Sequence, residues 1–183
     1  MGLQVSFVRH RQRRDRVYVT RHDGSSTAWD FPSYGDRLPH DLCHLVVEEE
    51  LGIVDGFWGL VDQGVEVELV DNQATLVRDG SPLVAQPGVD FSDLVGAEEA
   101  VASLAPTGIV TEQVGAVTVA RLDASSTSAA DRGLGLPDGA SPDAVASVRR
   151  RLRDLGEQWR RLEDGEAITL PYSGRTGRTG HTH

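Results

Sequence analysis

The chain has 183 residues and a formal net charge of −10 at pH 7, and 39% of its residues are hydrophobic. This length fits one domain with tails, and the hydrophobic content excludes a chain that is disordered throughout. No apolar run reaches the roughly 20 residues that a membrane helix needs, and a single cysteine, Cys43, excludes an intrachain disulfide and a multi-cysteine zinc site. The first arginines follow the N-terminal apolar residues, the reverse of the order in a signal peptide, so we expect a cytoplasmic protein without a membrane partner.

The first part of the chain has the pattern of a small antiparallel sheet followed by a helix. Pro39 fits the first turn of a helix and Gly52 fits the residue that ends one, so the spacing predicts a helix over Pro39–Leu51. Before it, short β-prone runs alternate with polar turns and predict three strands, at Leu3–Val8, Arg16–Arg21 and Thr27–Phe31.

The next segment is apolar and broken by glycines. Over Ile53–Gly64 we expect a short helical turn that carries Phe57 and Trp58 into the core. Val65–Val70 and Ala74–Val77 then flank a polar turn, which predicts a hairpin.

Two or three more helices are predicted further along. Ser92–Leu104 has helical spacing behind a serine cap, and Ile109–Leu122 fits a helix or a strand, of which we expect the helix. Residues 125–140 have the composition of a linker, and Ser141 then caps the clearest helix, Pro142–Leu162. The apolar stripe of that helix, which we assign to the core, consists of Val145, Val148, Leu152, Leu155, Trp159 and Leu162.

These elements predict a fold of the α+β class. A strand at Ala167–Tyr172 would close against the N-terminal strands, and the helices at 39–51 and 142–162 would pack on the resulting sheet. We therefore expect one domain over residues 1–172 and a disordered tail over 173–183.

The charged residues are unevenly distributed. From Asp36 to Ser103 fifteen carboxylates stand against two arginines, whereas both flanking segments are rich in arginine, so we expect the basic segments to pack beside the acidic middle. A sequence pI near 5.0 disfavours a nucleic-acid partner. The basic segments contain Arg9, Arg11, Arg13, Arg14, Arg16 and Arg21, and then Arg149, Arg150, Arg151, Arg153, Arg160 and Arg161.

One constellation carries chemistry. His40, His44 and Glu48 stand at positions i, i+4 and i+8 of the predicted helix, within a sector of about 80°. One helical turn separates the two imidazoles, so both can reach one divalent ion, for which zinc is the first choice. Glu48 leans toward His44 and would be a further ligand or the acceptor that fixes its tautomer.

The same residues also permit a purely structural interpretation. His40 and His44 lie beside an apolar side of the helix and can be core histidines, with Asp41 complementing the helix dipole. Asp41 occupies the position of the general base in the H-E-x-x-H zinc peptidases, but an aspartate is shorter, which argues against that activity. Cys43 is expected to be a packed residue. A third ligand is not identified; the candidates are His22, Asp23, Asp55 and Asp62.

The run RLPHDLCHLVVEEELGIVDGFWGLV, Arg37–Val61, resembles an uncharacterised family of small proteins from high-GC Gram-positive bacteria. Its members share an LPHDLxHxxVExELG…GFWG block, and the resemblance implies no activity. The HDxxH portion is also similar to the metal motif of a ubiquinone-biosynthesis scaffold family. That family has a glutamate twelve residues past the second histidine, where this chain has Gly56.

The hypothesis that follows is a divalent-metal-binding protein, with a hydrolase or a lyase as the expected kind of enzyme. His40 and His44 would be ligands, Glu48 a ligand or the partner of His44, and Asp41 a base that orients water. The alternative is a non-enzymatic interaction domain whose acidic middle binds a basic protein or a second copy of the chain as a homodimer.

Overall fold

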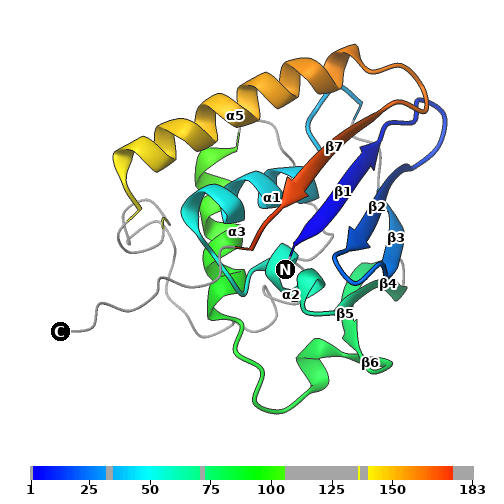
Figure 1. The fold of residues 1–183 in the computed structure, drawn as a ribbon, viewed down its shortest axis with the longest axis vertical. Helices are drawn as coiled ribbons and strands as arrows, with labels where there is room; N and C mark the ends of the chain where they lie inside the picture. The colour runs from blue at the N-terminus through cyan, green and yellow to red at the C-terminus, as the bar shows by residue number, and fades with distance from the viewer. Residues whose placement is uncertain (1, 32–34, 71–72, 106–135, 137–139, 175–183) are drawn as a thin grey trace.

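A computed structural model of the protein describes residues 2–31, 35–70, 73–105, 136 and 140–174. The fold is α+β, as predicted: a four-stranded antiparallel sheet has the order β3-β2-β1-β7 and is accompanied by helices (Figure 1). Its strands are β1 (Leu3–Val8), β2 (Asp15–Arg21), β3 (Ser26–Phe31) and β7 (Ala167–Tyr172).

Strand β7 closes the sheet against β1, as the sequence predicts. The two strands pair along their full length, with Leu3 opposite Tyr172 and Val8 opposite Ala167. Alternate side chains of β1 and β2 are buried, and the residues between them face outward, which is the pattern of a sheet with one covered face. The buried positions therefore define the face on which the helices pack.

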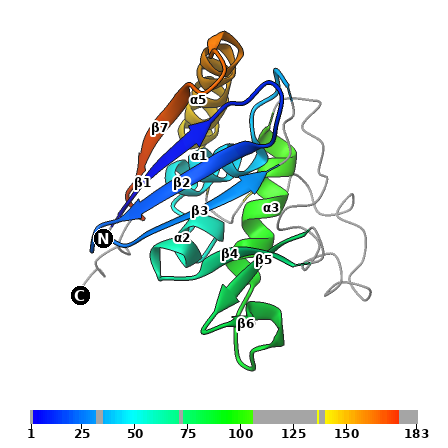
Figure 2. The ribbon, with the colours of Figure 1, turned by 90° about the vertical axis from the view of Figure 1, so that its right-hand side faces the viewer.

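The helices lie on that face of the sheet (Figure 2). They are α1 (His40–Leu51), α2 (Phe57–Asp62), α3 (Ser92–Leu104) and α5 (Pro142–Arg161). Helix α1 contacts the other three, and every residue from His40 to Glu48 is buried. A helix that is buried on all sides must place its polar side chains against partners in the protein interior.

The ends of these helices agree with the sequence signals in most cases. Gly52 ends α1 with φ +71°, and the Ser141 hydroxyl accepts a hydrogen bond from the Ala144 amide at the start of α5. The expected serine cap of α3 is wrong, because the residue before the helix is Phe91 and Ser92 is already helical. The Ser92 hydroxyl instead donates to the Asp90 carboxylate. Pro39 precedes α1 and is not its first residue.

A second, smaller sheet has the order β4-β5-β6. The predicted hairpin forms its first two strands, β4 (Glu66–Val70) and β5 (Gln73–Arg78). The short strand β6 (Ser81–Pro82) and the 3-10 turn η1 (Leu83–Ala85) were not expected from the sequence. The hairpin is confirmed, although Gln73, which was predicted in the turn, already pairs with Val70.

Several predictions concern residues outside the described part of the chain. These are the helix at 109–122, most of the linker at 125–140 and the tail from residue 175. Within the described part, the apolar stripe of α5 is buried as expected, except that Val145 is half-buried. No described helix combines the length and the apolar character that crossing a bilayer requires.

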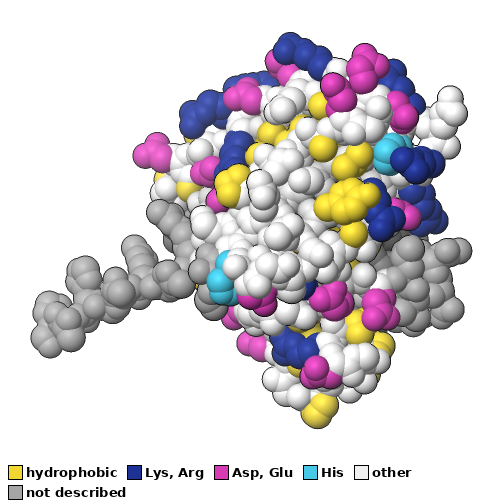
Figure 3. Space-filling view, turned by 45° about the vertical axis from the view of Figure 1, so that its right-hand side comes forward, with side chains coloured by type: hydrophobic (Ala, Val, Ile, Leu, Met, Phe, Trp, Pro, Cys, Tyr) yellow, Lys and Arg dark blue, Asp and Glu magenta, His cyan; other side chains and the backbone are white. Residues whose placement is uncertain are grey.

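Arginines of the two basic segments contact carboxylates of the acidic middle, as the charge pattern predicts. Arg151 of α5 bonds both Glu49 and Glu50, and the buried Arg21 reaches Glu66. Arginine and acidic side chains intermingle on the face that Figure 3 shows.

Candidate metal centre

Helix α1 supplies two histidines from successive turns. It begins at His40, and the ring centroids of His40 and His44 are 4.7 Å apart. Both residues are buried, with His40 8% and His44 2% exposed. The i, i+4 spacing therefore directs both imidazoles to one side of the helix, as the sequence pattern predicts.

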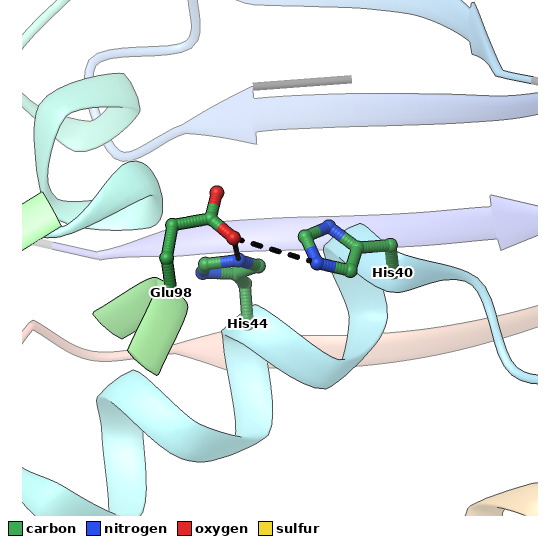
Figure 4. A group of neighbouring side chains, drawn as sticks. All are labelled: His40, His44 and Glu98. Atoms are coloured by element: carbon green, nitrogen blue, oxygen red, sulfur yellow. Dashed lines mark ion pairs between the residues drawn. The ribbon is translucent and has the colours of Figure 1, made fainter. Parts of the chain in front are cut away.

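Helix α3 brings a carboxylate to the two rings. Oε2 of Glu98 lies 3.3 Å from Nε2 of His44 and 3.6 Å from Nε2 of His40 (Figure 4). One ligand atom from each of the three residues falls within 4.8 Å of the others. His40, His44 and Glu98 thus form a group that can hold a metal ion.

The distances from Glu98 to the two rings are compatible with a metal centre. Zinc binds histidine nitrogens and carboxylate oxygens at about 2.0–2.2 Å, so two ligand atoms at a tetrahedral ion stand about 3.3 Å apart. Nε2 of His44 is buried and makes no hydrogen bond within the described residues, although Glu98 is near. A buried nitrogen without a hydrogen bond is costly unless a charged partner faces it, which is Glu98 for the protonated ring or a metal ion for the neutral ring.

Glu48 lies behind His44 and is not part of the group. Its Oε1 is 3.2 Å from Nδ1 of His44, while its two oxygens accept hydrogen bonds of 2.9 Å from the amides of Phe57 and Trp58. An ionised carboxylate can only accept, so Nδ1 of His44 is the donor, and Nε2 is the nitrogen that can bind an ion once its proton is lost. Of the two roles that the sequence allowed for Glu48, this geometry favours the one that fixes the tautomer of His44.

Asp41 points to a different set of partners. Its Oδ2 accepts a hydrogen bond of 3.0 Å from the indole of Trp29, and its carbonyl oxygen accepts one of 2.8 Å from the indole of Trp58. Asp41 is 5% exposed and is not in the group of possible ligands. Two tryptophans from β3 and α2 therefore fix the residue next to the first histidine.

The electrostatics of the cluster are those of buried groups in close contact. Burial alone would lower the pKa of His44, but Glu98 and then Glu48 outweigh it and raise this pKa to about 10. Burial and the neighbouring His44 lower the pKa of His40. Burial raises the pKa of Glu48, and it acts on Glu98 in the same direction, but the two histidines overcome it and the pKa of Glu98 is lowered.

The sequence analysis did not identify Glu98. Its candidates for a third ligand, His22, Asp23, Asp55 and Asp62, are not in the group that the structure brings together. A signal was present in α3: Glu98 follows the buried Leu94 by four positions and precedes the buried Val101 by three, so it lies on the apolar side of its helix. A carboxylate in such a stripe needs a cationic or metal partner.

Cys43, Phe57 and Trp58 were expected to be packed residues. Cys43 is fully buried, and burial raises the pKa of its thiol, which disfavours the reactive thiolate. Trp29, Phe57 and Trp58 pack on each other at centroid distances of 5.1–6.0 Å, and Phe57 lies 6.2 Å from the ring of His44. Phe57 therefore joins this aromatic group to the cluster.

The chain was compared with protein-family models, with curated proteins and with solved structures, and none of them matches.

Proposed function

We propose that this protein binds a divalent metal ion, with zinc as the preferred metal, through His40, His44 and Glu98. The observation that carries the proposal is the convergence of two imidazole nitrogens and a carboxylate oxygen from two helices. The buried Nε2 of His44, which lacks a hydrogen bond within the described residues, supports a cation at this point. Nitrogen and oxygen donors of this kind suit zinc.

The three ligands that the described residues supply fit an enzyme. Structural zinc sites are closed by four protein ligands, whereas catalytic sites have three and leave a position for water or substrate. The side chain of His40 is 10% exposed and that of Glu98 is 17% exposed, against 3% for His44. Solvent therefore approaches the group from the side of His40 and Glu98. We therefore propose a hydrolase or a lyase, in which the metal supplies Lewis acidity.

In this proposal Asp41 is the base, which is the role that the sequence indicated for it. It is buried next to His40, and its pKa is raised by burial, which brings a carboxyl group closer to the range of a general base at neutral pH. The indole of Trp29 holds its Oδ2, so the side chain is fixed in one direction.

The resemblance to the family with the LPHDLxHxxVExELG…GFWG block is also part of the proposal. The block contains His40, Asp41, His44 and Glu48, together with the segment of Phe57 and Trp58 whose amides bind Glu48. The residues of the block thus meet around one cluster, to which Glu98 is added from outside it. This arrangement supports a common metal centre in such proteins.

The test is the metal content of the purified full chain, measured by mass spectrometry. His181 and His183 are replaced by alanine in every sample, since they could bind metal nonspecifically. We expect close to one zinc per chain, and none after the further change of His40 and His44 to alanine. His22→Ala is the control, because His22 is an exposed histidine outside the group. A metal that survives the double change, or a metal-free parent protein that takes up no zinc, contradicts the proposal.

A further inference from the structure

Glu48 is the most heavily bonded carboxylate next to the candidate metal centre. It is 1% exposed, and its two oxygens face three donors: Nδ1 of His44 and the amides of Phe57 and Trp58. The first donor belongs to a proposed ligand and the other two to the first residues of α2. Glu48 therefore connects the metal centre to a helix that supplies no member of the group.

The place of this carboxylate depends on Gly56. A Cβ atom at residue 56 would lie 2.6 Å from Cδ, 2.7 Å from Oε2 and 2.9 Å from Oε1 of Glu48, and these are the three atoms nearest to it. Such distances are too short for carbon next to carbon or oxygen, so one of the two groups would have to move.

Gly56 is the N-cap residue of α2, but its backbone angles do not themselves require a glycine. Its φ of −73° and ψ of −167° are extended values that alanine also adopts. The absence of a side chain at residue 56 therefore makes room for the Glu48 carboxylate. A methyl group there would displace this carboxylate and, through it, disturb the contact with Nδ1 of His44.

We propose that Glu48 is the positioning residue of the metal centre and that Gly56 determines where its carboxylate stands, so that metal affinity depends on a glycine outside the ligand group. The inference rests on the proposed function, because it concerns the same site. Glu48 holds Nδ1 of His44 as the donor, which leaves Nε2 to bind the ion. By linkage, metal binding also strengthens the attachment of the first turn of α2.

The experiment is a double-mutant cycle on the full chain, with zinc affinity measured by competition against a chromophoric chelator. Gly56→Ala and Glu48→Ala are each expected to weaken zinc binding about 10- to 100-fold, the usual effect of losing a partner that orients a ligand. The double variant should bind no more weakly than Glu48→Ala, because the methyl group then meets no carboxylate. Gly156→Ala in α5 is the control, since a Cβ there makes only contacts of 3.7–3.8 Å.

A second readout separates positioning from stability. In the zinc-loaded wild type, nitrogen-15 NMR should show a proton on Nδ1 of His44 that exchanges slowly with water. In folded Gly56→Ala this proton should exchange rapidly, because its acceptor has moved. This measurement needs no Glu48 variant, so it still applies if Glu48→Ala does not fold.

The outcomes distinguish the two proposals. A wild type that binds no zinc overturns both. Zinc binding that is equally tight in wild type and Gly56→Ala overturns only the role of Glu48 and Gly56, as does a Gly56 effect that persists in full when Glu48 is alanine. Weakened binding in Gly56→Ala, absent in Gly156→Ala and lost in the Glu48→Ala background, supports the inference.

Discussion

Nε2 of His44 lies 3.3 Å from Oε2 of Glu98, so the centre of α1 and the centre of α3 meet at a pair of potential ligand atoms. His44 and Glu98 each stand among buried apolar residues of their own helix. Without a metal, the protonated ring of His44 and the carboxylate of Glu98 form an ion pair across this contact. The contact therefore identifies the point at which a divalent cation would be most strongly stabilised.

Glu98→Gln replaces an anionic ligand with a neutral amide. Loss of a residue that only orients a ligand costs up to about 100-fold in metal affinity, so we expect the loss of this ligand to weaken zinc binding by more than about 100-fold. Glu99→Gln is the matched control, since Glu99 is the exposed neighbour on the same helix. The measurement is zinc affinity by competition with a chelator. Equal losses in the two variants would mean that bulk charge, and not the position of Glu98, determines the affinity.

Zinc affinity should rise with pH. Glu98 and Glu48 together raise the pKa of His44 to about 10 despite its burial, so the imidazole of the metal-free protein carries a proton on both nitrogens at neutral pH. Zinc binds the neutral ring, and the proton on Nε2 must leave. One released proton corresponds to about a tenfold gain in affinity per pH unit below pH 10, or about 100-fold between pH 6 and pH 8. The pKa of His40 is lowered, so this residue contributes less to the proton release than His44 does.

This pH dependence can be measured by titration calorimetry in two buffers with different ionisation enthalpies. The difference between the two heats gives the number of protons released, for which we expect a value near one. No proton release and an affinity independent of pH would show that His44 is neutral before zinc arrives.

Asp41→Asn should leave the zinc content unchanged. The carboxylate of Asp41 accepts from the Trp29 indole and is not in the ligand group, and the asparagine carbonyl can accept the same hydrogen bond. Metal content is again measured by mass spectrometry, with circular dichroism as the check of folding. Loss of zinc from a folded Asp41→Asn protein would place Asp41 among the ligands and change the proposed set.

Cys43 should not react with an aromatic disulfide reagent in the native protein. The residue is fully buried, and burial raises the pKa of its thiol, so both access and the thiolate are lacking. Because the chain has one cysteine, the absorbance change reports this residue alone. The reaction should become complete in guanidinium chloride, and its native rate should follow the opening of α1. Rapid labelling without denaturant would contradict the packing of α1.

Most of the fold could be predicted because its signals are local. Alternation identified the strands of the main sheet, and Gly52 and Ser141 marked the end of one helix and the start of another. The cap of α3 was assigned wrongly because a serine near a helix start can lie inside the helix as well as before it. Strand β6 is two residues long and has no periodicity to recognise.

Only the part of the candidate site that lies on one helix could be predicted from the sequence. The spacing of His40 and His44 follows from helical geometry, but the approach of Glu98 depends on how α3 packs on α1, and no local pattern encodes that contact. The position of Glu48 depends in the same way on the amides of α2. A search for carboxylates within apolar stripes would have selected Glu98, since the stripe on α3 also contains Leu94 and Val101.

The pairing of β7 with β1 has a consequence for synthesis on the ribosome. Strand β1 is made first, but one of its two edges remains open until Ala167–Tyr172 has been translated and has left the exit tunnel. During that interval the edge beside Val5 and Phe7 can pair with another nascent chain, since an unpaired apolar strand is a template for association. Shortened chains that stop before Ala167 should therefore aggregate in a translation reaction, whereas chains that extend past Tyr172 stay dispersed.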